Sequence, residues 1–221
     1  MILEVKDLLA TAEVDHLRAL AGRMAFVDGR ATNTGFGQKM NLQADPQDAA
    51  AAEASKLLAE AFRRSREFCD FTLPKRIAPP LLARYEPGMK YGPHADAALL
   101  PSKGGPLRSD VSCTVFLSDP SSYEGGELVL HLGARSVAMK TAPGTAIVYP
   151  STTLHEVAPV RAGERLVGIT FIESFVADEM KREVLYELGE VSALEGDNMN
   201  LINRMRLEVV RQNLTRRWSG G

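Results

Sequence analysis

The segment from residue 79 to residue 175 alternates short apolar runs with turn residues, and this pattern constrains the fold most strongly. Gly, Pro, Asp and Ser dominate the stretches between the runs. Many short strands at such spacing favour an antiparallel sandwich or barrel over a parallel sheet, which needs crossover helices. The strands predicted in this way are Leu81–Tyr85, Val111–Leu117, Glu127–His131, Ser136–Met139, Thr145–Tyr149 and Leu166–Ile172.

The N-terminal part of the chain has helical periodicity instead. Residues 11–24 place apolar side chains at helical spacing, with Thr11 as the candidate N-cap. Residues 46–69 predict a second helix with a broad apolar face, and Pro46 suits its first turn.

Beyond the β-rich segment the pattern is helical again. One helix is expected to end at Gly189, because glycine commonly stops helices, and another begins near Asn198. Apolar residues run along both helices, which either brace the core or form a homo-oligomer interface. The expected fold is mainly β (α+β), with an N-terminal helical support (1–78), a β core (79–175) and a C-terminal helical segment (176–221).

Charge and hydropathy argue against several classes of partner. The net charge is −2 and the isoelectric point is about 6.1, so no strong basic field attracts nucleic acid or an anionic membrane. No apolar run approaches the roughly 20 residues that span a bilayer. The first residues include acids where a signal peptide has basic residues. We expect a cytoplasmic protein with neither nucleic acid nor membrane as a partner.

Two of the four histidines stand in a pattern typical of a metal site. His94 and Asp96 are separated by one residue, and side chains two positions apart in an extended segment point to the same side. His155 follows the last-but-one predicted strand and a turn. Two imidazoles and a carboxylate can hold one face of an ion and leave the other open, as in non-haem Fe(II) oxygenases. The alternative is a surface turn with a hydrogen-bonded His–Asp pair.

Arg165 lies ten residues after His155, at the head of a predicted strand. Its planar guanidinium can hold a carboxylate through two hydrogen bonds. An Fe(II) enzyme that uses 2-oxoglutarate needs such a group for the distal carboxylate of the keto acid. Taken alone, Arg165 reads as a surface charge beside Glu164. Together with the three candidate ligands, it favours a 2-oxoglutarate site.

The candidate residues lie in or beside five sequence blocks, namely Leu82–Tyr85, Tyr91–Asp96, Thr114–Ser118, Tyr123–Leu128 and Tyr149–Arg165. Together these blocks resemble the prolyl-4-hydroxylase-type 2-oxoglutarate/Fe(II) dioxygenases. More closely, the chain is similar to the bacterial PKHD-type hydroxylases, a group linked to iron uptake. The resemblance covers nearly the whole chain, and no metal or arginine position departs from it.

The resemblance implies a double-stranded β-helix, or jelly roll, with Fe(II), 2-oxoglutarate, O2 and often L-ascorbate. It implies metal ligation by His94, Asp96 and His155 and cosubstrate binding by Arg165. Tyr85 occupies a place where this superfamily often has a tyrosine near the cosubstrate; otherwise it is a core aromatic. No primary substrate is implied.

Two weaker assignments concern the surroundings of the site. Thr114 lies in a predicted strand, one face of which can form the floor of the cosubstrate pocket. The stretch 97–110 follows the ligands directly and contains Gly and Pro, as irregular lids beside active sites do. Lys103 or Arg108 in this stretch either meets a substrate or is solvated.

The leading prediction is a 2-oxoglutarate-dependent Fe(II) dioxygenase that hydroxylates an unidentified substrate. Two alternatives use the same jelly roll. A zinc hydrolase or isomerase would use the same three ligands, but Arg165 would then have no evident task. A binding module would sense iron or 2-oxoglutarate without turnover.

Overall fold

Two antiparallel sheets form the centre of the computed structural model, which describes residues 1–32 and 38–220. The larger sheet has the order β1-β14-β10-β17-β6-β4-β2, with β5 added beside β17. Its strands are β1 (Leu3–Val5), β2 (Phe26–Asp28), β4 (Leu42–Ala44), β5 (Pro74–Ile77), β6 (Leu81–Tyr85), β10 (Val111–Phe116), β14 (Ala146–Pro150) and β17 (Arg165–Ser174).

The smaller sheet has the order β13-β12-β15-β7-β3. Its strands are β3 (Lys39–Met40), β7 (Lys90–His94), β12 (Leu128–Leu132), β13 (Arg135–Met139) and β15 (Leu154–Val157). Side chains of both sheets pack together between them, including Phe116 and Val167 from the larger sheet and Leu130 from the smaller one. The protein is therefore mainly β, and all six strands expected from the sequence are present within two residues of their predicted ends.

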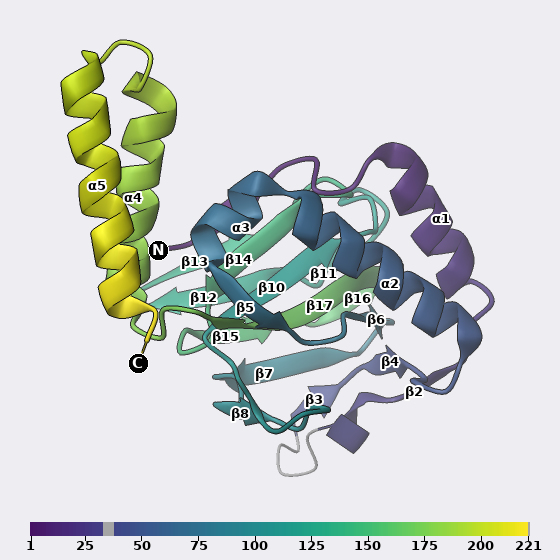
Figure 1. Cartoon of the computed structure of the whole chain (residues 1–221). Helices are drawn as coiled ribbons and strands as arrows, with labels where there is room; N and C mark the ends of the chain where they lie inside the picture. The colour runs from purple at the N-terminus through teal and green to yellow at the C-terminus, as the bar shows by residue number, and fades with distance from the viewer. Residues whose placement is uncertain (33–37, 221) are drawn as a thin grey trace.

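Helices α1 (Thr11–Ala21), α2 (Ala49–Arg64) and α3 (Arg66–Thr72) come from the N-terminal third of the chain and cover the larger sheet (Figure 1). Leu17, Leu58 and Phe62 are fully buried there and share one core with Val115 and Val148 of the sheet. This core occupies the face of the larger sheet opposite the smaller one, because successive strand residues point to opposite faces.

Several predicted helix boundaries were wrong. The helix expected over 46–69 breaks at Ser65, whose backbone is extended and whose hydroxyl accepts a hydrogen bond from the Phe68 amide. It also begins at Ala49 rather than Pro46, because the Asp48 side chain caps its first turn. In the first helix Ala10, not Thr11, is the N-cap residue, and the helix already ends at Ala21.

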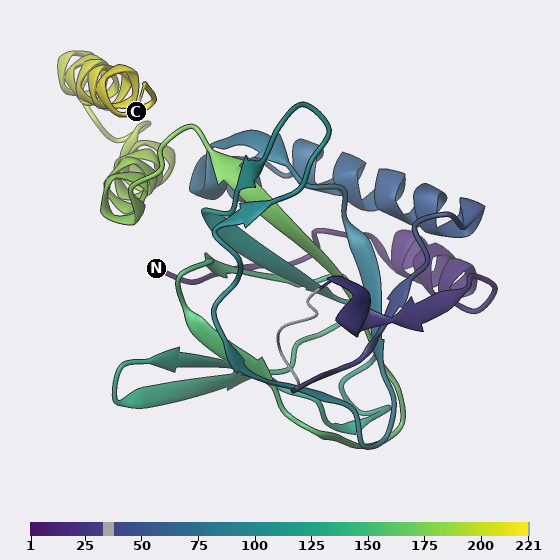
Figure 2. The same ribbon diagram turned by 90° about the horizontal axis from the view of Figure 1, so that it is seen from below.

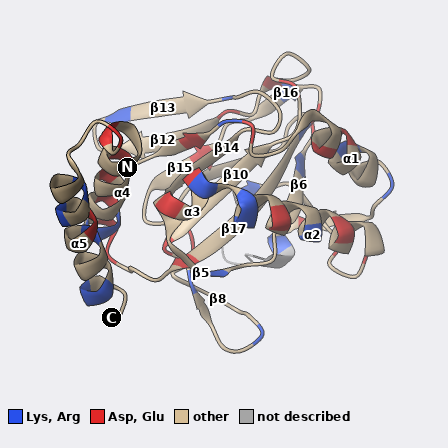
Figure 3. Cartoon of the chain, turned by 45° about the horizontal axis from the view of Figure 1, so that its top comes forward, with Lys and Arg blue, Asp and Glu red and all other residues tan. Residues whose placement is uncertain are grey.

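Helices α4 (Glu179–Glu195) and α5 (Leu201–Trp218) form a hairpin that stands out from the body of the molecule (Figures 1 and 2). The predicted stop at Gly189 was wrong, since α4 continues for six more residues. A glycine inside a helix costs about 1 kcal/mol, and burial of Leu185 and Tyr186 at the base of α4 offsets this. Acidic residues gather on α4 and basic residues on α5 (Figure 3).

Two short strand pairs complete the fold. One joins β11 (Glu124–Gly125) to β16 (Val160–Ala162), and the other joins β8 (Leu99–Leu100) to β9 (Leu107–Arg108). The stretch 97–110, expected to be irregular, thus contains a small hairpin. Within the described ranges, no helix is both long and apolar enough to cross a membrane.

Candidate active site

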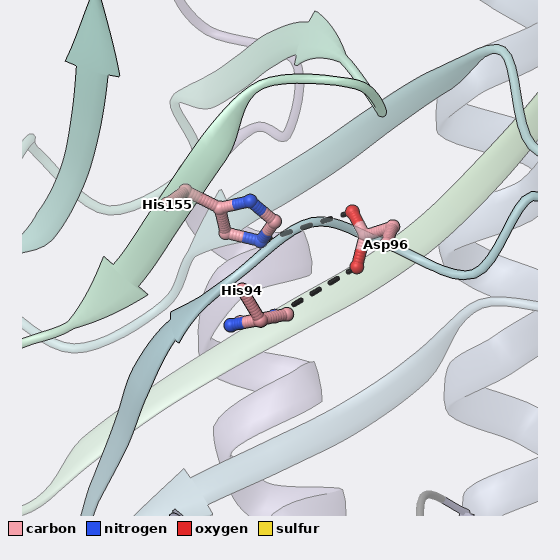
Figure 4. Close-up of side chains that lie close together, drawn as sticks. All are labelled: His94, Asp96 and His155. Carbon is pink, nitrogen blue, oxygen red and sulfur yellow. Dashed lines mark ion pairs between the residues drawn. The ribbon is translucent and has the colours of Figure 1, made fainter. Parts of the chain in front are cut away.

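His94, Asp96 and His155 come together between the two sheets, as Figure 4 shows. His94 ends β7 and lies directly across from His155 of β15 in the antiparallel pairing. Asp96 follows two residues later, where its backbone amide donates to the Ser151 carbonyl. The Asp96 carboxylate oxygens lie 3.9 Å from Nε2 of His94 and 3.7 Å from Nε2 of His155.

These three side chains fit a metal ion. One ligand atom from each lies within 4.8 Å of the other two, and donors that share an ion at bonds of about 2.1 Å are separated by about 3 Å or slightly more. Nδ1 of His94 lies 2.8 Å from the Gly92 carbonyl, and Nδ1 of His155 lies 2.9 Å from the Thr153 carbonyl. Because a carbonyl only accepts, both Nδ1 atoms carry the proton, and each Nε2 presents a lone pair to the site.

Aromatic rings hold both imidazoles in place. The Tyr91 ring is stacked on His94, with centroids 3.6 Å apart, and the Tyr149 ring meets His155 edge-on at 5.0 Å. The imidazoles are almost fully buried, at 7% and 4% exposure. Their orientation is thus set by packing before any ion binds.

A chain of buried serine hydroxyls holds the third candidate ligand. Ser112 of β10 donates to Asp96 Oδ2 at 2.5 Å, Ser151 lies 2.7 Å from Ser112, and Ser109 lies 2.8 Å from Ser151. The ionised carboxylate only accepts, so Ser151 must donate to Ser112, and Ser109 to Ser151. Ser109 and Ser151 were missed from the sequence, because isolated serines 42 residues apart carry no local signal.

Removing the Ser112 hydroxyl is expected to weaken metal binding without unfolding the protein. Groups that orient a metal ligand are typically worth about tenfold to about a hundredfold in affinity. Ser112→Ala should raise the dissociation constant for Fe(II) by that factor, and Ser112→Thr should recover most of the loss. An anaerobic competition titration against a chromophoric chelator measures both. Equal affinity in wild type and Ser112→Ala would contradict this prediction.

Burial lowers the pKa of His94 to about 4, and the nearby His155 adds to the shift. Between about pH 6.5 and about pH 4 the unfolded chain therefore takes up a proton at this position and the folded, metal-free protein does not. The free energy of unfolding should fall as the pH falls through this window. Below about pH 4, His94 should no longer make the free energy of unfolding depend on pH. Urea unfolding of wild type and His94→Gln at several pH values tests this. Parallel profiles for the two proteins would contradict it.

Arg165 opens β17 and is among the most buried side chains, at 1% exposure. Its Nε has no hydrogen-bond partner, and no carboxylate of the described residues lies within ion-pair distance. The guanidinium lies 5.0 Å from the Tyr85 ring centroid and 5.5 Å from that of Phe116. Burial lowers the pKa of Arg165. A buried cation without a counter-ion is costly, so this position suits an anionic ligand.

Tyr85 lies opposite Arg165 in the pairing of β6 with β17. Its hydroxyl accepts a hydrogen bond from Asn41 Nδ2 at 3.1 Å, which leaves the phenolic proton free to be donated. Asn41 is buried, and its own Oδ1 has no hydrogen-bond partner among the residues that the structure describes. Tyr123 lies near enough to Arg165 to interact electrostatically, but its hydroxyl makes no hydrogen bond of good geometry. Two phenols and a guanidinium thus surround one small region.

One face of β10 connects the two parts of the site. Ser112 contacts Asp96, and Thr114, two residues later on the same face, lies near enough to the Tyr149 phenol to interact with it electrostatically. Phe116, two residues further on, packs beside Arg165. Thr114 therefore lies between Ser112 and Phe116 on this face, and its place in the pocket floor stays a prediction.

Lys39 and Asn41 are site residues that the sequence did not indicate. Lys39 is 5% exposed and its ammonium lies 5.4 Å from the Tyr91 ring centroid. Burial lowers its pKa to about 8, against an opposing attraction from Asp96. Lys39 begins β3 and Asn41 lies between β3 and β4, and both strands are too short to show a strand pattern. Only the tertiary fold brings them to the site.

The two residues proposed for a lid lie in different surroundings. Arg108 donates two hydrogen bonds to Asp110, at 2.7 and 2.9 Å, and one to the Ser174 carbonyl at 3.0 Å. Its guanidinium is thus bound to the larger sheet. Lys103 is exposed at the turn of the β8–β9 hairpin. The lid role of this hairpin stays a prediction.

Comparison with known proteins supports the same chemistry. The family model of the 2OG-Fe(II) oxygenase superfamily matches residues 80–173. A PKHD-type hydroxylase from Sphingopyxis alaskensis is 51% identical over 213 residues, which cover 96% of this chain and 97% of that protein.

Two solved structures share the fold. A 2OG-Fe(II) oxygenase family oxidoreductase from Burkholderia pseudomallei has a TM-score of 0.59 at 23% identity, covering 77% of this chain and 84% of that one. A prolyl hydroxylase from Trichoplax adhaerens, in complex with a hypoxia inducible factor oxygen degradation domain peptide fragment, has a TM-score of 0.59 at 17% identity; the coverage is 83% and 86%.

Both structures are 2-oxoglutarate oxygenases with a jelly-roll core, so the fold expected from the sequence is confirmed. The relatives extend along nearly the whole chain, including the terminal helices. The chain therefore belongs to the PKHD-type hydroxylases of the 2OG-Fe(II) oxygenase superfamily and is a 2-oxoglutarate-dependent dioxygenase.

Proposed function

We propose that His94, Asp96 and His155 hold the catalytic Fe(II), and that Arg165 binds the distal carboxylate of 2-oxoglutarate. The observation that carries this proposal is that the buried Arg165 guanidinium has no counter-ion among the described residues. One face of β10 extends from this guanidinium to the cluster of three candidate metal ligands. Tyr85 donates its free phenolic proton to the same carboxylate. A guanidinium with five N–H donors beside a hydroxyl group binds a carboxylate better than it binds a neutral group.

The residues of the chain position the reactants. When bound, Fe(II) and 2-oxoglutarate supply the oxidation by O2 that hydroxylates a C–H bond and yields succinate and CO2. His94 and His155 offer neutral Nε2 atoms, and Asp96 offers a charge that the serine chain orients. Because a carboxylate occupies the third protein position, no place is left there for a halide, which favours hydroxylation over halogenation. Thr114 and Tyr149 form the pocket floor.

The physiological setting is also a proposal. We infer a cytoplasmic hydroxylase of an unidentified substrate that serves iron uptake and uses ascorbate to keep the metal ferrous. Relatives of this chain are named PKHD-type hydroxylases, and this supports the reaction class. Residues 1–78 act as a support for the core at 79–175, consistent with their shared apolar cluster, and 176–221 forms the C-terminal helical segment.

Succinate release tests the proposed reaction. Protein with Fe(II), 2-oxoglutarate and O2 should release succinate slowly, and faster when a true substrate from a screened library is added. Asp96→Ala is the matched control and should release none. Tight binding of iron and 2-oxoglutarate without succinate under any condition would favour a sensing module. Conversion of a substrate with zinc and without 2-oxoglutarate would favour the hydrolase alternative.

A further inference from the structure

The α4–α5 hairpin has an apolar face that the rest of the chain covers only in part, since Leu207 and Leu214 of α5 are half-buried and its other members are exposed. We call it the hairpin face and define it by exposed residues of α4 and by exposed or half-buried residues of α5. The α4 residues recur at spacings of four, seven and three, which places them along one side of the helix. The hairpin face comprises Met180, Val184, Val191, Leu194, Leu207, Val210 and Leu214.

Helix α5 is held by the chain much less firmly than α4. The base of α4 is anchored, since Tyr186 packs edge-on against Phe71 of α3 at 5.2 Å and Leu185 is buried. In α5, by contrast, no residue is buried along its 18 residues, and Figures 1 and 2 show it on the far side of α4 from the body. An isolated helix of this length is only marginally stable in water. Contacts with a further partner would therefore stabilise α5.

The charges of the hairpin are segregated by helix. Helix α4 carries five glutamates beside Lys181 and Arg182, whereas α5 carries five arginines and a single glutamate. Several of these charges have no ion-pair partner among the residues that the structure describes, namely Glu187 and Glu195 on α4 and Arg206, Arg216 and Arg217 on α5. A surface that is acidic on one side and basic on the other complements itself.

We propose that the hairpin face binds the hairpin face of a second copy of this chain. A two-fold axis would set α4 of each copy against α5 of the other, so that acidic and basic helices meet twice and four helices form a bundle. A hairpin face about 26 Å long and about 20 Å wide has a flat footprint of about 500 Å², and its protruding side chains raise the accessible area toward the roughly 800 Å² per partner of a stable interface. Nucleic acid or an anionic membrane would be repelled by α4.

The first experiment compares two substitutions of the same kind in the full-length, metal-free protein. Val191→Glu places a charge in the hairpin face, and Val137→Glu places one on β13 at nearly equal exposure, 41% and 40%. Sedimentation equilibrium at micromolar concentration should show a dimer for wild type and for Val137→Glu. Val191→Glu should raise the dimer dissociation constant about a hundredfold, because the charge is buried twice. A monomeric wild type, or equal dissociation constants for the two variants, would overturn the proposal.

The second experiment tests the pairing of α4 with α5. One chain carries Glu187→Arg and Glu195→Arg, and another carries Arg206→Glu and Arg217→Glu. Each alone should be mostly monomeric, because like charges would face each other, but an equimolar mixture should form heterodimers. Circular dichroism checks that both chains keep their helices. Homodimers of either chain as stable as wild type, or a mixture that stays monomeric, would overturn this arrangement. Because no metal or cosubstrate is used, the result is independent of the proposed reaction.

Discussion

Replacing Asp96 by alanine is expected to abolish stoichiometric Fe(II) binding while the protein stays folded. Asp96 is the only charged member of the three-ligand cluster, and without it two neutral imidazoles face the ion alone. His94→Ala should have the same effect, because it removes one of three donors from a site that needs all three. The measurement is the iron content after anaerobic loading and gel filtration, with thermal unfolding to verify the fold.

His131 provides a matched control for this experiment. It also lies on a strand beside a carboxylate, with Nε2 3.4 Å from Glu156, but it stands outside the cluster. His131→Ala should therefore keep one iron per chain. Full iron content in Asp96→Ala and His94→Ala would mean that the metal binds elsewhere.

Replacing Arg165 by alanine should leave iron binding intact and weaken 2-oxoglutarate binding on the order of a hundredfold, since a charge-assisted pair in a partly dry pocket is worth a few kcal/mol. Arg165→Lys should recover the affinity only in part, because an ammonium keeps the charge but not the fork. The readout is the charge-transfer absorption of the anaerobic Fe(II) protein during titration with 2-oxoglutarate.

Arg84 is the control for this second prediction. It precedes Tyr85 on β6, points to the other face of the same sheet and pairs with Glu86 at 3.3 Å. Arg84→Ala should therefore leave the affinity for 2-oxoglutarate unchanged. Equal affinity in wild type and Arg165→Ala would remove Arg165 from the proposed site. A parallel unfolding measurement should show that 2-oxoglutarate stabilises the iron-loaded wild type and not Arg165→Ala, because only a binding ligand shifts the equilibrium.

The residues of the metal cluster could be predicted because their signals are local. The His-x-Asp spacing needs only the two-residue repeat of an extended strand, and His155 follows a recognisable strand and turn. Arg165 was identified from its position at the head of a strand. The structure brings all of these residues to one region, and their roles remain the proposals tested above.

The parts that escaped prediction depend on contacts between distant segments. The break at Ser65 and the continuation through Gly189 were decided by capping and by packing of neighbouring helices, which outweigh local propensity. Asn41 and Ser151 reach the site only because short strands pair with β6 and β7 and because a turn follows β14. No periodicity in the sequence reports such contacts.

Strand β10 has a consequence for the length of acceptable cosubstrates. Its alternate side chains contact Asp96 at Ser112 and Arg165 at Phe116, so four peptide units at about 3.3 Å each separate the two ends. A β-strand in the middle of a sheet does not stretch, so the distance between the ligand cluster and Arg165 is fixed. A dicarboxylic keto acid one methylene shorter or longer than 2-oxoglutarate is therefore expected to bind more weakly, because neither end of the site can move to follow it.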